Sequence, residues 1–99
     1  MVVFVSRHRG ASDWALRKGL RVDRTAAHLD AETVSPGDIV VGSLPVHVAA
    51  QVCERGGRYF HLTLDVPEAM RGTELSAEQM ERAGARLEEY RVERLEERA

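Results

Sequence analysis

The sequence predicts an α/β domain with a mainly parallel sheet of about four strands, flanked by helices. Short runs of β-branched and aromatic residues alternate with helical patterns along the chain, which is typical of this fold class. Residues 38–42 form an almost continuous apolar run, as expected for a parallel strand that is covered on both faces. With 99 residues, the chain is expected to form a single domain over residues 1–99, with one modest core.

The first part of the chain is expected to contain three strands and one helix. The helix, at residues 11–18, is expected to end at Gly19. Right-handed crossovers would place the first and third strands near the middle of the sheet. In order, the expected elements are a strand at residues 2–6, a helix at residues 11–18, an irregular strand within residues 20–28, a loop at residues 30–37 and a strand at residues 38–42.

The second part is expected to contain two helices and one strand. Ser43 can cap a helix that has Pro45 in its first turn, and Ser76 and Gln79 have the spacing of a capping box. The expected elements are a helix from Pro45 to the Gly56-Gly57 pair, a strand at residues 59–64, a loop through Pro67 and Gly72, and a last helix from Ser76 toward the C-terminus, with Met80, Ala83, Leu87 and Tyr90 on one face.

Composition limits the ligands that the chain could bind. The net charge is −2, with a small basic excess in residues 1–61 and an acidic excess in residues 62–99, so no broad basic stripe for duplex nucleic acid is present. Cys53 is the only cysteine, which excludes an internal disulfide. No run is long enough to span a membrane or to act as a signal peptide, and we expect a cytoplasmic protein with a small anionic ligand.

The segment from Ser6 to Ala11 concentrates polar chemistry at a turn between a strand and a helix. The first N–H groups of a helix lack partners and favour phosphate or carboxylate. Arg7 could clamp two phosphate oxygens, and His8 could carry a proton near neutral pH. Gly10 would let the backbone approach a ligand closely. We therefore interpret this segment as a candidate anion site.

A second polar turn, at residues 42–47, follows the third strand. Ligands of open α/β sheets collect beyond the carboxyl ends of the strands, where the chain order reverses. We therefore expect this turn to lie beside the segment from Ser6 to Ala11. His47, in the first turn of the second helix, is either a ligand contact or an ordinary solvated histidine.

Several of these side chains also have purely structural interpretations. Arg7 and Arg9 could be surface charges, with His8 capping the helix. Trp14 could stack on a nucleobase, although packing at the edge of the core is favoured over stacking. Three other side chains are expected to be structural. His28 and His61 are expected to be hydrogen-bonded histidines, and Cys53 is expected to lie in the core.

An Arg-His-Gly sequence after a first strand is the signature of the histidine phosphatases. Here Arg9 is inserted before Gly10, and the chain has about half the usual length of that fold, so the phosphatase interpretation is weak. Paired carboxylates and metal-ligand spacing are also missing beside the two turns, and we expect no metal and no cofactor.

Four separated motifs resemble one family over nearly the whole chain. They are Val-Phe-Val-Ser-Arg-His-x-Gly-Ala-x-x-Trp at residues 3–14, Pro-Gly-Asp at residues 36–38, Gly-Ser-Leu-Pro-Val at residues 42–46 and Arg-Gly-x-Glu-Leu-Ser at residues 71–76. The chain is similar to small CRISPR accessory proteins found beside type III systems, the sixteenth subtype of the Csx group. The resemblance implies a reduced, CARF-like form of the Rossmann-like fold and a ring nuclease that removes cyclic tetra-adenylate, the messenger of type III antiviral signalling.

A metal-independent mechanism follows from that implied substrate. Each ribose 2′-hydroxyl is adjacent to its phosphate, so positioning for in-line attack does most of the work and gives linear products with a cyclic phosphate end. Arg7 would stabilise the transition state, aided by N–H groups of Gly10 and Ala11, and His8 is the candidate general acid or base. The expected catalytic residues are Arg7 and His8, and the expected ligand contacts are Ser6, Arg9, Gly10, Ala11, Trp14, Gly42, Ser43, Leu44, Pro45 and His47.

The rotational symmetry of the ring suggests a homodimer that encloses it with two copies of Arg7, His8 and Ser43. Two alternatives stay open: a non-catalytic protein that sequesters the messenger, and a protein-interaction subunit that binds no such ligand.

Overall fold

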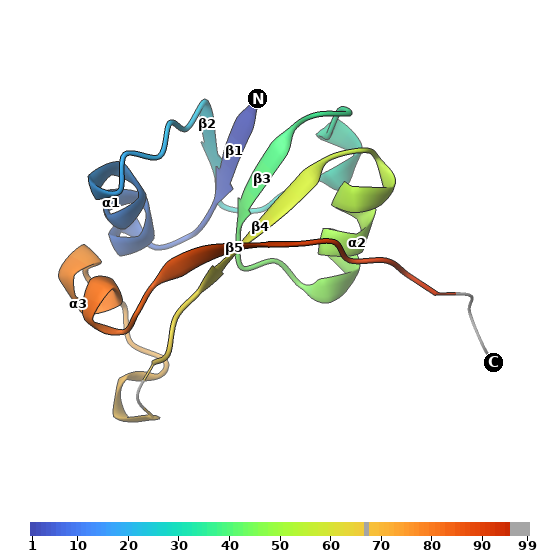
Figure 1. The fold of residues 1–99 in the computed structure, drawn as a ribbon. Helices are drawn as coiled ribbons and strands as arrows, with labels where there is room; N and C mark the ends of the chain where they lie inside the picture. The colour runs from blue at the N-terminus through green and yellow to red at the C-terminus, as the bar shows by residue number, and fades with distance from the viewer. Residues whose placement is uncertain (67, 96–99) are drawn as a thin grey trace.

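The computed structural model describes residues 1–66 and 68–95, and the α/β prediction is confirmed in them. Five strands form one sheet in the order β2-β1-β3-β4-β5, one strand more than expected (Figure 1). β1 to β4 are parallel and β5 is antiparallel to β4, an arrangement compatible with a small Rossmann-like fold. The elements are β1 (Val2–Val5), α1 (Arg9–Arg17), β2 (Arg24–Ala26), the 3-10 helix η1 (Ala31–Thr33), β3 (Ile39–Gly42), α2 (Val46–Glu54), β4 (Arg58–Thr63), the 3-10 helix η2 (Glu68–Met70), α3 (Ala77–Arg82) and β5 (Arg86–Tyr90).

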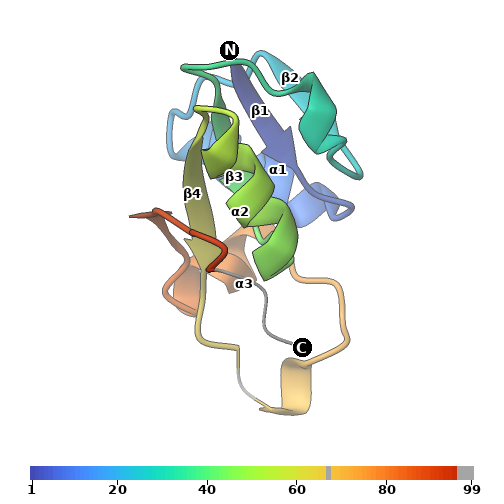
Figure 2. The same ribbon diagram turned by 90° about the vertical axis from the view of Figure 1, so that its right-hand side faces the viewer.

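The sheet separates two hydrophobic cores. α1 and α3 cover one face and α2 covers the other, as the two orthogonal views show (Figures 1 and 2). Phe4 and Val41 point into the core under α1 and α3, whereas Val40 and Tyr59 point into the core under α2. This alternation of neighbouring strand residues is the period of two that a sheet covered on both faces requires.

β1 and β3 are neighbours near the middle of the sheet, as expected. The chain leaves β1 through α1 to reach β2 on one side, and then crosses to β3 on the other side of β1. The chain order therefore reverses between β1 and β3. In open α/β sheets, the crevice beyond the carboxyl ends of the strands at this point is the usual ligand site.

The prediction of one long C-terminal helix is wrong. The capping box of Ser76 and Gln79 is present, but α3 ends at Arg82, and Gly84 has a φ of +73°. A glycine in the left-handed region terminates the helix and turns the chain back onto the sheet. Residues 86–90 then pair with β4, with Leu87 opposite Leu62, so they form a strand. Pro67 and residues 96–99 lie outside the described residues.

The other elements deviate less from the expected ranges. The second strand is confined to the three residues of β2, and the expected loop at residues 30–37 contains the turn η1. Gly56, with a φ of +83°, follows the end of α2 as expected. Among the described residues, no helix combines the length and apolar character needed to cross a bilayer.

Candidate functional site

A cavity of about 520 Å³ lies at the carboxyl edge of the sheet, where β1 and β3 end. The turn between β1 and α1 lines it with Ser6, Arg7 and His8, and the first turn of α1 adds Ala11. The turn between β3 and α2 lines it with Ser43, Leu44 and Pro45. The expectation that the two polar turns lie side by side is confirmed. The cavity is of the size that takes a small molecule or part of a larger ligand.

Two hydrogen bonds fix the turn between β1 and α1. The Ser6 N–H donates to the carbonyl of Ala26 at 2.9 Å, which ties this turn to the end of β2. The His8 N–H donates to the Ser6 hydroxyl at 3.0 Å. His8 is the N-cap residue of α1, but its imidazole makes no capping hydrogen bond and is exposed. The ring therefore faces solvent at the cavity rather than satisfying the helix.

Arg7 is the cation of this turn that lines the cavity. It is exposed, and within residues 1–66 and 68–95 no hydrogen bond or ion pair engages its guanidinium group. Among the described residues that line the cavity, Arg7, His8 and His28 can carry positive charge and none is acidic. A guanidinium without a protein partner, in a cavity without carboxylates, favours an anionic ligand.

The backbone N–H of Ala11 is not free to stabilise a transition state, which is the role that the sequence had suggested. Its N–H donates to the carbonyl of His8 at 3.2 Å, so the helix itself uses this donor. Gly10 also differs from the expectation of a close approach to a ligand. A Cβ at Gly10 would lie 1.8 Å from the carbonyl oxygen of Leu75, so the glycine permits close packing of α1 against the segment before α3.

The turn between β3 and α2 begins with a close contact between strands. A Cβ at Gly42 would lie 2.5 Å from the carbonyl oxygen of Val5, so glycine allows β1 and β3 to approach at their carboxyl ends. The expectation that Ser43 caps α2 is wrong. Its hydroxyl donates to the carbonyl of Leu62 at 2.9 Å, and Pro45 is the N-cap residue without a side-chain cap. Ser43 thus ties the turn to β4.

Tyr59, which sequence reasoning did not single out, supports the same turn from β4. Its side chain is buried, and its hydroxyl accepts a hydrogen bond from the Leu44 N–H at 2.9 Å and contacts the Gly42 carbonyl at 3.1 Å. Burial raises the pKa of this hydroxyl, although the bond from Leu44 opposes the shift. The Nδ1 atom of His61 lies 2.6 Å from the hydroxyl, which confirms the prediction of a hydrogen-bonded His61.

Metal-ligating side chains are not gathered at this site. Within the described ranges, no three His, Cys, Asp or Glu side chains are grouped so that they could hold a metal ion.

A comparison with models of known protein families gives one match. A model of the family described as "Putative CRISPR-associated protein (Cas_VVA1548)" matches residues 3–93. The chain belongs to this family. No curated protein and no solved structure gives a significant match to it. The matched range includes both turns and all described residues that line the cavity, so the site is part of the family's own domain.

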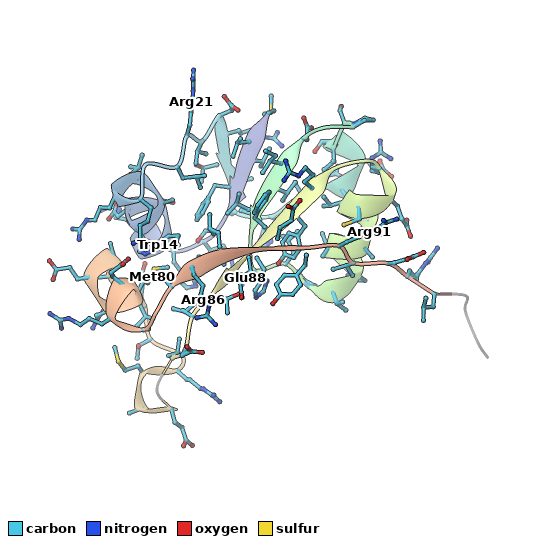
Figure 3. All side chains as sticks on the ribbon, viewed as in Figure 1. Trp14, Arg21, Met80, Arg86, Glu88 and Arg91 are labelled. Carbon is cyan, nitrogen blue, oxygen red and sulfur yellow. The ribbon has the colours of Figure 1, made fainter. Side chains whose placement is uncertain are left out.

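Five expected ligand contacts of this CRISPR-associated protein are not among the residues that line the cavity: Gly10 and Gly42, whose packing roles are given above, and Trp14, Arg9 and His47. Trp14 is 3% exposed and packs with Met80 between α1 and α3, with its indole N–H donating to Glu81 at 2.7 Å (Figure 3). This placement confirms the structural interpretation of Trp14 and leaves no face for stacking on a base. Arg9 and His47 are exposed on the first turns of α1 and α2, outside the lining.

His28 was expected to be a hydrogen-bonded structural histidine, and this prediction is wrong. It is exposed, and it lines the cavity with Ala27 and Leu29 at the carboxyl end of β2. Because β2 is parallel to β1, its carboxyl end must lie at the same edge, and this rule could have identified all three residues from the sequence. The segment after β4 adds a further wall, with Leu64, Val66, Thr73 and Leu75. No sequence pattern indicated that wall.

Proposed function

We propose that this CRISPR-associated protein is a ring nuclease, which binds and linearises cyclic tetra-adenylate in type III signalling. Family membership supports the role in CRISPR defence. One observation carries the choice of an anionic nucleotide: Arg7 and His8 line one cavity at the reversal point of the sheet, together with the turn of Ser43, and no described lining residue is acidic.

The proposed step transfers a phosphodiester within the substrate. The ribose 2′-oxygen attacks the adjacent phosphorus and loses its proton to a base, while the bond from phosphorus to the 5′-oxygen breaks and that oxygen takes up a proton. The product is a linear chain with a 5′-hydroxyl and a 2′,3′-cyclic phosphate. No water enters the bonds that change, so the protein has to orient the ribose and stabilise charge.

Arg7 and His8 fit these two tasks. The planar guanidinium of Arg7 matches two non-bridging phosphate oxygens and stays charged at working pH. His8 follows Arg7 directly in the sequence and has an exposed imidazole. It is the candidate for taking the proton from the 2′-hydroxyl or giving one to the 5′-oxygen. Ser6 and Tyr59 contribute indirectly, because they hold the two turns in place.

The cavity of one protomer is small compared with a ring of four nucleotides. A volume of about 520 Å³ suits a small ligand or a section of a larger one, whereas the ring contains four nucleotides. We therefore propose a homodimer with the ring across its two-fold axis, in which each protomer contributes Arg7, His8 and the Ser43 turn.

Turnover distinguishes this enzyme from a protein that only sequesters the messenger. The test incubates an excess of labelled cyclic tetra-adenylate with the protein in EDTA and separates the ring from linear products. The nuclease hypothesis expects several turnovers per protein. A stoichiometric complex that releases intact ring on denaturation would support sequestration, and the absence of binding would support an interaction subunit.

Variants in the same assay test the assignment of roles. Arg7→Ala should lose most binding and cleavage, and His8→Ala should lower cleavage about a hundredfold with a smaller effect on binding. Arg17→Ala, which removes an exposed arginine from the last turn of α1, serves as the charge-matched control and should behave like the native protein. Native turnover in Arg7→Ala would contradict the proposed site.

A further inference from the structure

A second hollow of about 370 Å³ lies next to the cavity at the carboxyl edge of the sheet. The two spaces are adjacent, because four residues line both of them: Leu64, Val66, Thr73 and Leu75. The remaining described residues of the second hollow are Met70, Arg71 and Gly72. They belong to the segment around η2, which projects beyond the sheet (Figures 1 and 2).

The second hollow combines apolar walls with a single cation. Leu64, Val66 and Met70 provide surfaces on which a flat heterocycle could lie, and Arg71 provides charge beside them. No described lining residue of either space is acidic. This is the chemistry of a nucleotide subsite, with an apolar surface for the base and a guanidinium for the phosphate.

A short turn holds Arg71 in place. The Arg71 N–H donates to the carbonyl of Glu68 at 3.2 Å, and the Thr73 hydroxyl donates to the carbonyl of Met70 at 2.6 Å. Gly72 has a φ of +80°, a left-handed conformation that favours glycine. The turn is thus built from local hydrogen bonds, and its arginine is presented on a defined backbone.

The carboxylates of the same segment do not neutralise Arg71. Asp65 pairs with Arg86 at 3.4 Å, and Glu68 and Glu74 are exposed outside the lining of both spaces. Within residues 1–66 and 68–95, no hydrogen bond or ion pair engages the guanidinium of Arg71. Both cavities therefore present one arginine without a protein partner, Arg7 in the first and Arg71 in the second.

We propose that the second hollow binds a second, consecutive nucleotide of the ligand and that Arg71 clamps its phosphate. The inference rests on the proposed function, because that function names the ligand as an adenylate chain. It adds that Arg71 makes the protein prefer a chain with two phosphates over a chain with one.

A binding cycle with two linear dinucleotides tests this assignment. Adenylyl-adenosine has one phosphate, and its 5′-phosphorylated form has two. The native protein should bind the two-phosphate form about tenfold more tightly, and Arg71→Ala should reduce this preference to less than about threefold. Arg71→Lys should retain an intermediate preference, because a lysine keeps the charge without the fork. Arg82→Ala removes an exposed arginine of α3 outside both spaces and should keep the full preference.

Each outcome decides the inference. An unchanged preference in Arg71→Ala, an equal loss in Arg82→Ala, or no binding of either dinucleotide would overturn it. The proposed function is decided separately by cleavage of the ring. If the ring is cleaved while Arg71→Ala keeps its preference, the subsite is wrong and the nuclease stands. If Arg71 controls the preference but the ring is not bound, the subsite stands and the nuclease is wrong.

Discussion

The Tyr59 hydroxyl and the Nδ1 atom of His61 lie 2.6 Å apart, and the same hydroxyl reaches the turn between β3 and α2. A tyrosine hydroxyl has one hydrogen to donate. When Nδ1 carries a hydrogen, His61 donates to the tyrosine, whose own hydrogen then goes to the carbonyl of Gly42, 3.1 Å away. When Nδ1 is unprotonated it takes the tyrosine hydrogen instead. The position of one proton on His61 thus selects how Tyr59 holds the turn.

Tyr59→Phe should weaken both the fold and the site. The change leaves the part-buried Leu44 N–H without its acceptor, and we expect the loss of this hydrogen bond to cost about 1 kcal/mol of unfolding free energy. Because Leu44 lines the cavity, affinity for adenylates should also fall. Denaturant unfolding and ligand titration measure the two effects. Tyr90→Phe is the control: Tyr90 is 47% exposed, and its loss should change stability by less than about 0.5 kcal/mol.

Gly10→Ala should destabilise the protein, although alanine is the better helix former. Helix propensity alone predicts a gain of about 1 kcal/mol. The new Cβ would lie 1.8 Å from the carbonyl oxygen of Leu75, and such overpacking costs about 1–3 kcal/mol or more. Thermal denaturation decides the sign. Leu16→Ala, at a position that is 70% exposed on the same helix, should leave the midpoint nearly unchanged, and a stabilised Gly10→Ala would contradict the close packing of α1.

Glu81→Gln should destabilise the protein near neutral pH and have a smaller effect in acid. The Lys18 ammonium, 2.6 Å away, and the indole N–H of Trp14 lower the pKa of Glu81 below its usual value of 4.5. A lowered carboxyl pKa in the folded state stabilises the fold above pH 4.5, and this contribution is lost as the pH falls through the folded-state pKa. Unfolding curves of Glu81→Gln and of the native protein should therefore differ most at pH 7, and the difference should shrink as the pH is lowered from 4.5 toward 3.

The control for this pH series is Glu74→Gln, which neutralises an exposed glutamate with no ion pair to a described residue. Its stability should follow the native protein at both pH values. A difference between Glu81→Gln and the native protein that does not shrink at all as the pH is lowered from 7 to 3 would contradict an electrostatic role for Glu81.

Arg7→Lys should retain binding better than it retains cleavage. Lysine keeps the positive charge but loses the fork that engages two phosphate oxygens. We expect cleavage of cyclic tetra-adenylate to fall about tenfold, which corresponds to about 1.4 kcal/mol of transition-state stabilisation. Single-turnover rates and binding constants, measured together, separate the two effects. Equal rates for arginine and lysine would reduce the role of Arg7 to that of a point charge.

Local sequence was sufficient to predict the elements that place the site. β1 and β3 are short runs rich in β-branched residues, each followed by polar residues, and their parallel pairing brings those residues to one edge of the sheet. The juxtaposition of Arg7 with the Ser43 turn thus depends on topology alone. The role of His28 was missed because the second strand was expected to extend to residue 28, whereas β2 ends at Ala26 and leaves His28 in the turn at its carboxyl end.

Features that depend on distant contacts could not be predicted in this way. Residues 86–90 have helix-forming side chains, yet pairing with β4 and burial of Leu87 against the core make them a strand. The roles of Gly10 and Tyr59 are set by partners more than ten residues away, Leu75 in one case and Leu44 in the other. Their residue types alone are compatible with either a ligand contact or a structural role.

The two cores that the sheet separates have a consequence for how the protein can change. Substitutions on opposite faces share no partners, so their effects on stability should add, and each face could vary without constraining the other. The two cores meet at the cavity. Its lining includes Leu62 and Met80 from one core and Leu29 and Leu44 from the other. A bound molecule would contact residues of both cores, so substitutions at these positions on opposite faces should not have additive effects on ligand binding.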